Sequence, residues 1–455
     1  MVIAWASNMS AAFNRLVARI AAAELPIVIL LSPVLLFPSP TRLLLVLVVP
    51  AVWLCNWHAN GKLIPSTPLN VALFVLLGMV AVSLVATFDV QFSLGKVSGV
   101  GLGILLFWAM VRWVTTPARL RAAVATLVLA GAALAVLGLL GANWVPIAKF
   151  EVLNAIVQRL PRAIRGVPGA EEGFNANAVA GCLVLFVPLQ VALLMGAAKP
   201  SLPAWQPSDE RRKWETVVQA FLLVLTAGTL LLTQSRGAWL GLVAAAVAFF
   251  AWYSRLTRTL AAAIVVGILV LTATLGLERT TNLAVSRSGT GMANSVPTRI
   301  EIWSRAIYGI QDFPFTGMGM NTFRRVMPVL YPAFLTPPDW DVAHAHNHLL
   351  QAALDLGLPG LVAYGSIWIV VGSLLIVVYR HSRQLTYRII AGGLGAGLIA
   401  HFAFSMTDAI PLGAKVGALF WLALALSVAL HRIALPDSRV LQQLDIDPAL
   451  SHSRD

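Results

Sequence analysis

Three histidines lie within five positions near the end of a long polar segment in an otherwise apolar chain. His344, His346 and His348 alternate with other residues, and imidazole, with a pKa of about 6.5, can exchange a proton at neutral pH. The pattern predicts a helix over 343–356, because a glycine and a proline directly follow it. On such a helix His344 and His348 share one side and His346 points away from both.

The spacing of His344 and His348 is also one that zinc sites use. The large loop supplies no carboxylate or cysteine near these two histidines in a supporting pattern of ligands. Its acids are Glu278, Glu301, Asp312, Asp339, Asp341 and Asp355. The sequence therefore predicts no metal and no other cofactor, and Asp341 is the carboxylate predicted to orient a histidine ring.

Two arginines occupy positions where a phosphate could bind. Arg236 lies in a very short connection between two apolar segments, where a cation either reaches an ordinary phospholipid headgroup or binds a substrate phosphate. Arg299 lies in the first turn of a helix predicted to begin at Thr298, with Glu301 completing a capping box. The planar guanidinium group suits phosphate oxygens because it donates two hydrogen bonds at once.

Two further polar residues lie beside predicted membrane-spanning segments. Asn177 follows a polar turn, where it either lines a site or caps a helix. Asp408 lies in the last short turn, and Lys415 in the same turn predicts a local salt bridge between them.

The composition defines the class of protein. In 455 residues, 58% are hydrophobic, only 11% are charged, and the mean hydropathy is +0.82, which predicts an all-α polytopic membrane protein. The net charge of +13 is assigned to loops anchored at the membrane, so no nucleic-acid partner is predicted. The two cysteines, Cys55 and Cys182, lie in apolar segments without ligand spacing.

About twelve spans are predicted from runs of about 20 apolar residues. They divide the chain into nine spans in 1–277 with an outer loop at 142–175, a large outer loop at 278–357, three spans in 358–431, and a tail at 432–455. Most lysines and arginines of the short loops fall on the side of the two termini, which predicts that this side and the tail are cytoplasmic. The histidines are then on the outer side.

Three motifs resemble those of bacterial O-antigen ligases. His346 and Asn347, followed after nine residues by the string GLPGLVAY at 357–364, resemble the signature of these enzymes. The segment DFPFTGMGMN at 312–321 resembles a D-x-P-x-x-G-x-G-x-N segment of the wider ligase and polymerase superfamily, and its glycines are predicted to form turns only. Arg236 with Leu240 resembles an R-x-x-x-L motif of the ligases.

This resemblance implies a fold like that of the GT-C type lipid-using glycosyltransferases, in the bacterial inner membrane with a periplasmic active site. It implies metal-independent, inverting transfer of O-antigen polysaccharide from undecaprenyl pyrophosphate to a sugar hydroxyl of lipid A-core. His346 is predicted as the catalytic base, and Arg236 and Arg299 as the pyrophosphate-binding residues. The supporting candidates are Asn347, Asp341, His344, His348, Asn177 and Asp408.

Three alternatives remain open at this point. An O-antigen polymerase or a protein O-oligosaccharyltransferase would use the same donor with a different acceptor. A transporter of the lipid-linked sugar would predict charged or broken helices near the middle of the spans, whereas the cations of this chain lie at the ends of the spans.

Overall fold

The computed structural model describes residues 2–144, 151–168, 170–197, 209–253, 296–335 and 341–436, and isolated positions between 254 and 274. The chain is mostly helical, as predicted. The helices are α1 Val2–Ala22, α2 Glu24–Leu36, η1 Arg42–Leu47, α3 Val48–Asn60, α4 Asn70–Ala86, α5 Val90–Trp113, α6 Pro117–Gly141, α7 Glu151–Val157, α8 Ala176–Leu183, α9 Val187–Ala197, α10 Asp209–Leu232, α11 Arg236–Tyr253, α14 Val296–Asp312, α15 Phe323–Leu330, α16 His348–His381, α17 Leu385–Ser405, η4 Lys415–Gly417 and α18 Ala418–Ala434. Two short strands, β1 Ala142–Asn143 and β2 Phe174–Asn175, pair in parallel.

Eight helical segments within the described residues are long and apolar enough to cross a membrane, or nine if the bent pair Ala12–Ala22 and Glu24–Leu36 forms one span. Two shorter apolar helices, Asn70–Ala86 and Arg236–Phe250, coincide with two more of the predicted spans. The span predicted at 260–277 lies outside the continuously described residues, so the total of twelve stays a prediction. The chain is a multi-pass membrane protein.

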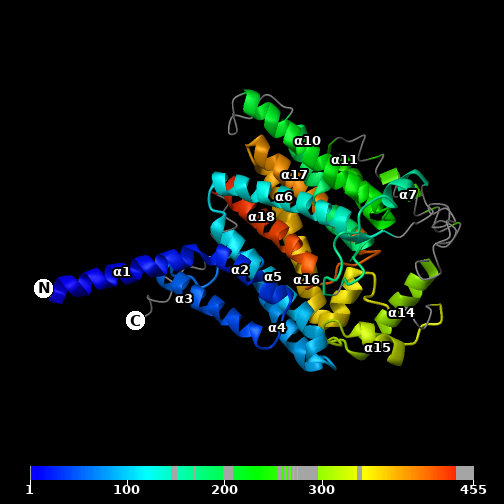
Figure 1. Cartoon of the computed structure of the whole chain (residues 1–455), viewed down its shortest axis with the longest axis horizontal. Helices are drawn as coiled ribbons and strands as arrows, with labels where there is room; N and C mark the ends of the chain where they lie inside the picture. The colour runs from blue at the N-terminus through cyan, green and yellow to red at the C-terminus, as the bar shows by residue number, and fades with distance from the viewer. Residues whose placement is uncertain are drawn as a thin grey trace, which may run out of the picture.

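Apolar side chains on facing helices form the core of the bundle. Trp108 on α5 and Trp421 on α18 are almost fully buried, as is Phe186 between α8 and α9. Figure 1 shows α6 and α18 side by side in this bundle, with α10 and α11 on one flank and α1 projecting from the body.

A smaller helical unit covers one end of the bundle. Ile302 on α14, Phe323 on α15 and Leu354 on α16 belong to one buried apolar cluster that joins the three helices. Figure 1 shows α14 and α15 side by side at this end. The Thr87 hydroxyl, just before α5, lies 3.0 Å from that of Thr322, so the unit is tied to the membrane-spanning helices.

The structure corrects two predicted helix starts. The histidine helix begins at His348 and not near 343, so His344 and His346 lie in the loop before it. Helix α14 begins at Val296, before the predicted cap at Thr298. The Glu301 carboxylate accepts hydrogen bonds from the backbone N–H groups of Phe334 and Leu335 at 2.6 and 2.9 Å, which tie α14 to the segment after α15.

The predicted end of the histidine helix is confirmed. Gly357 has φ +68° and ψ −179°, which breaks α16 into a segment before it and a long apolar segment after it. Such a backbone conformation is open to glycine and strained for other residues. The break lets the short segment 348–356 join the smaller helical unit while the remainder of α16 runs through the bundle.

Candidate functional site

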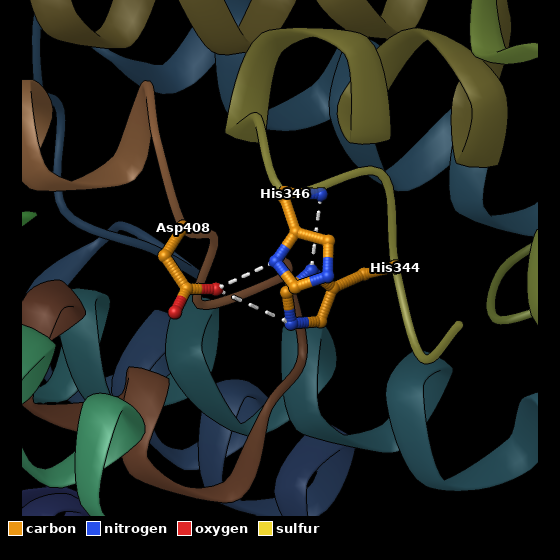
Figure 2. Close-up of side chains that lie close together, drawn as sticks. All are labelled: His344, His346 and Asp408. Carbon is orange, nitrogen blue, oxygen red and sulfur yellow. Dashed lines mark hydrogen bonds and ion pairs between the residues drawn. The ribbon is translucent and has the colours of Figure 1, made fainter. Parts of the chain in front are cut away.

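His344 and His346 from one loop meet Asp408 from the turn that follows α17. Nδ1 of His346 lies 3.0 Å from Oδ1 of Asp408, and Nε2 of His344 lies 3.8 Å from the same oxygen. Figure 2 shows both rings facing this carboxylate. The ring centroids of the two histidines are 4.4 Å apart, so the loop brings together the two histidines that a helix would have separated.

The loop conformation depends on Asn347, which ends the loop and caps α16. Its Oδ1 accepts hydrogen bonds from the N–H groups of Leu349 and Leu350 at 3.0 and 3.2 Å, satisfying free donors of the first turn. Its Nδ2 donates to the Met406 carbonyl at 3.4 Å. One asparagine therefore starts the helix and ties the histidine loop to the turn that carries Asp408.

Asp408 is a buried carboxylate held by polar partners from two sides. Besides His346, its Oδ2 accepts a hydrogen bond from Nδ2 of Asn177 at 2.9 Å. Asn177 lies in the first turn of α8, and the preceding Asn175 caps that helix, so Asn177 is left to contact the candidate site.

The predicted salt bridge between Asp408 and Lys415 is wrong. The Lys415 ammonium donates to the Pro168 carbonyl at 2.6 Å and lies 4.0 Å from the centre of the Phe37 ring. Asp408 is directed to His346 because the turn places its carboxylate against the histidine loop and Asn177.

Both predicted arginines lie beside the turn at 406–408. Nη1 of Arg299, on α14, donates to the Thr407 carbonyl. Arg236 starts α11, and a Cβ at the adjacent Gly237 would lie 2.8 Å from Oγ1 of Thr407, so α11 begins in contact with the same turn. The two guanidinium groups are close enough to repel each other electrostatically, a cost that a bound anion between them would offset.

The protonation states follow from burial and from the neighbouring charges. Burial lowers the pKa of His344 to about 3, and the neighbouring His346, Lys96 and Arg299 act in the same direction, so His344 is neutral at pH 7. Although burial alone would raise the pKa of Asp408, the hydrogen bond from His346 and the charge of Arg299 hold it below its usual value. Asp408 is therefore an anion.

Hydrogen bonding also assigns the tautomer of His344. Nδ1 of His344 accepts from the backbone N–H of His346 at 3.2 Å, so the proton of the neutral ring is on Nε2, which faces Asp408.

Two of the supporting candidates lie away from this cluster. Asp341 does not orient a histidine, because Arg324 holds it through two nitrogens, with Nε 2.7 Å from Oδ1. His348 is buried in the bundle, where Nδ1 lies 2.9 Å from the Tyr364 hydroxyl and the ring packs edge-on against Phe402. Tyr364, the last residue of the GLVAY string, thus holds the side chain of His348, the first residue of α16.

The three residues of the cluster could also hold a metal ion. His344, His346 and Asp408 each offer one ligand atom, and these atoms lie within 4.8 Å of one another. Among the described residues this is the candidate set, and it differs from the i, i+4 pair of His344 and His348. Three nitrogen and oxygen ligands are a set that zinc accepts.

The sequence did not indicate two residues that interact with this cluster, Lys96 and Gln351. Lys96, near the start of α5, interacts electrostatically with His344 and Asp355, and its only sequence signal is a lysine at the edge of an apolar span. Gln351, on the first turn of α16, accepts a hydrogen bond from the Ala345 N–H at 2.8 Å. No local pattern marks a glutamine for such a contact.

Together, the fold and the cluster define a multi-pass membrane protein with a His–Asp pair and two arginines at one end of its bundle. Residues 221–365 match the protein-family model described as O-Antigen ligase, which confirms the resemblance predicted from the motifs. The matched stretch contains Arg236, Arg299 and the histidine loop, whereas Asn177 and Asp408 lie outside it. No curated protein matches the chain. The match supports an O-antigen ligase-like function of the glycosyltransferase type, with polysaccharide or lipid-linked substrates.

Proposed function

We propose that this protein is an O-antigen ligase, which transfers O-antigen polysaccharide from undecaprenyl pyrophosphate to a sugar hydroxyl of lipid A-core. The observation that carries the proposal is the contact between His346 and Asp408 beside Arg299 and Arg236, in a chain whose residues 221–365 match this family. The site would face the periplasm from the inner membrane, as the distribution of lysine and arginine predicts.

The arginines would bind the leaving group. Transfer breaks the bond between the anomeric carbon and a phosphate oxygen, and the electron pair of that bond leaves with the pyrophosphate, which needs no proton. Negative charge grows on the leaving oxygen, so two guanidinium groups held beside it stabilise the transition state more than the substrate. Their mutual repulsion in the absence of an anion favours binding of the diphosphate.

His346 would act as the base. Asp408 is an anion and accepts a hydrogen bond, so the proton of a neutral His346 is on Nδ1 and Nε2 is the nitrogen that can take a proton. As the acceptor oxygen bonds to the anomeric carbon, its proton moves to Nε2, and Asp408 stabilises the resulting imidazolium. A single displacement without a carboxylate nucleophile inverts the anomeric configuration.

We further propose that transfer needs no metal ion. A divalent cation held by His344, His346 and Asp408 would add positive charge next to Arg299, and it would occupy the carboxylate that orients the base. EDTA is therefore expected to leave the transfer rate unchanged. Inhibition by EDTA that zinc or magnesium reverses would contradict this part of the proposal.

The decisive experiment is transfer with purified components and defined acceptors. Detergent-solubilised protein is mixed with polysaccharide on undecaprenyl pyrophosphate and, in separate reactions, with lipid A-core, with a second lipid-linked polymer, or with an acceptor protein. We expect polymer on lipid A-core. Lengthened lipid-linked polymer would instead identify a polymerase, and modified protein an O-oligosaccharyltransferase. For the protein reconstituted into vesicles, movement of the lipid across the bilayer without a new glycosidic bond would identify a transporter.

A further inference from the structure

The segment 312–321, predicted to form turns only, is the part of the sequence pattern that the proposed chemistry does not use. It packs directly on the helix that follows the histidine loop. The Met318 N–H donates to the Leu354 carbonyl at 2.7 Å, and the Leu358 N–H donates to the Pro314 carbonyl at 2.7 Å. A Cβ at Gly317 would lie 2.6 Å from the Gly357 nitrogen, so the glycines allow backbone to contact backbone.

From this segment a chain of hydrogen bonds leads through the buried side chains of Asp355 and Gln351 to the histidine loop. The Asn321 N–H donates to Oδ1 of Asp355 at 3.2 Å, and Nε2 of Gln351 donates to the same oxygen at 2.9 Å. Oε1 of Gln351 then accepts from the N–H of Ala345, the residue between the two site histidines, at 2.8 Å. Each side chain of this relay has a partner on either side.

The members of the relay are shielded from water. The exposed fractions are 3% for Gln351 and 1% for Asp355, and Ala345 is fully buried. Hydrogen bonds at such positions are costly to lose, because a buried N–H without a partner has given up its hydration and gained nothing in return. The amide of Gln351 can also be oriented in only one way here, since it must accept at one end and donate at the other.

The loop that the relay holds is conformationally demanding. His346 has φ +49°, in the left-handed region that non-glycine residues rarely adopt, and it precedes α16 in a stretch without regular secondary structure. Asn347 fixes the loop on the side of α16, and Gln351 fixes it through Ala345 on the other side of His346. Without the second restraint, the imidazole can relax out of line with Asp408.

We propose that Gln351 and Asp355 are positioning residues for His346, and that the 312–321 segment is the fixed support against which they hold the histidine loop. The inference rests on the proposed function, in which His346 is the base. It assigns a role in catalysis to two residues that touch neither the phosphate-binding arginines nor Asp408. A displacement of about 1 Å in a catalytic group can reduce a rate by about 100-fold.

Gln351→Met tests the relay while conserving volume and length. We expect kcat to fall by about 10- to 100-fold, with the KM for the donor lipid unchanged because the arginines are untouched. Hydrogen exchange of the peptide 341–350 should accelerate in parallel. The matched control is Gln190→Met, which removes a buried glutamine bonded to Thr226 on α10. The control should keep wild-type kcat and wild-type exchange at 341–350.

Gln351→Glu provides a second variant that keeps the side-chain length. At low pH the new carboxyl and Asp355 can share one proton, which preserves both hydrogen bonds. As the pH rises this proton is lost and the two carboxylates repel each other. The nearby Lys96 ammonium favours the charged carboxylates, so the proton is lost at a lower pH than it would be without the lysine. Activity relative to wild type should therefore be near normal at low pH and fall as pH rises, a pattern that a merely structural glutamine would not produce.

The outcomes distinguish the relay from the proposed function. Wild-type kcat and exchange in Gln351→Met, or a pH-independent Gln351→Glu, would overturn the relay while leaving the role of His346 intact. If the wild-type protein transfers no sugar, or if His346→Ala is fully active, the proposed function itself fails. Should Gln351→Met not accumulate as folded protein, the pH response of Gln351→Glu decides.

Discussion

The proposed chemistry depends on which nitrogen of His346 carries its proton. Asp408 settles this by accepting from Nδ1 at 3.0 Å, and Asn177 holds the carboxylate from the other side at 2.9 Å. The sequence indicated the histidine and the arginines by residue type. It did not indicate that Asp408 is the partner of His346, because the two residues are 62 positions apart and only the return of α17 to the same end of the bundle brings them together.

Arg299→Lys tests whether the guanidinium geometry, and not charge alone, binds the donor. Losing one charge-assisted hydrogen bond costs about 1.5–3 kcal/mol, so the Kd for undecaprenyl pyrophosphate should rise by about 10- to 100-fold. Equilibrium binding of the labelled lipid measures this. Arg165→Lys, at an exposed arginine, is the control that should bind normally. Normal binding by Arg299→Lys would exclude a two-pronged contact.

His344 should contribute a pH-dependent term to stability. Burial lowers its pKa from 6.5 to about 3 in the folded protein, so the unfolded chain binds a proton first as the pH falls. Stability is therefore present above pH 6.5 and is lost as the pH falls toward about 3. His344→Asn should make the Tm less dependent on pH between about 7 and 5, whereas His381→Asn, at an exposed position, should match wild type. An equal change of Tm with pH in wild type, His344→Asn and His381→Asn would contradict the lowered pKa of His344.

Helix ends, more than helix interiors, create the candidate site. Arg236, Asn177 and Asp408 lie at the start or just past the end of α11, α8 and α17, and the histidine loop directly precedes α16. The apolar runs predicted most spans. They could not predict that α16 begins at His348. Asn347 ties the loop to Met406, 59 positions away, and Gln351 holds it through a side-chain hydrogen bond to Ala345 that no hydrophobic periodicity contains.

Gly357→Ala tests the break in α16. Its φ is +68°, and a Cβ there would lie 2.5 Å from the Phe315 carbonyl oxygen, so both strain and steric overlap oppose the substitution. We expect a loss of about 1–3 kcal/mol in stability, seen as a lower Tm, together with slower transfer. Gly365→Ala, on the same helix with open space around its Cβ position, should be neutral. A neutral Gly357→Ala would show that the break is not required.

In the whole molecule, the smaller helical unit covers one end of the membrane-spanning bundle. Hydrogen bonds and packing join α14, α15 and the 312–321 segment to α5 and α16, so the histidine loop is supported by elements far apart in the chain. Composition predicted the bundle, and the distribution of lysine and arginine predicted its orientation. The smaller helical unit is joined to the bundle by tertiary contacts, which the sequence does not show. This is why the 312–321 segment had no predicted role beyond its turns.

Cysteine labelling tests the predicted orientation. In a protein lacking Cys55 and Cys182, Leu335→Cys should react in intact cells with a membrane-impermeant maleimide that reaches the periplasm, and Arg383→Cys should react only after lysis. Both native side chains are exposed. The reverse pattern would place the histidine loop in the cytoplasm and exclude a periplasmic transferase.

The most direct test is the transfer rate of His346→Ala and Asp408→Asn, measured with purified protein alongside donor-lipid binding. A positioned base contributes about 10²- to 10⁴-fold, so His346→Ala should lose transfer by at least that factor and Asp408→Asn by a smaller one, while both still bind undecaprenyl pyrophosphate. Near wild-type transfer by folded His346→Ala would contradict the assignment of this imidazole as the group that deprotonates the acceptor.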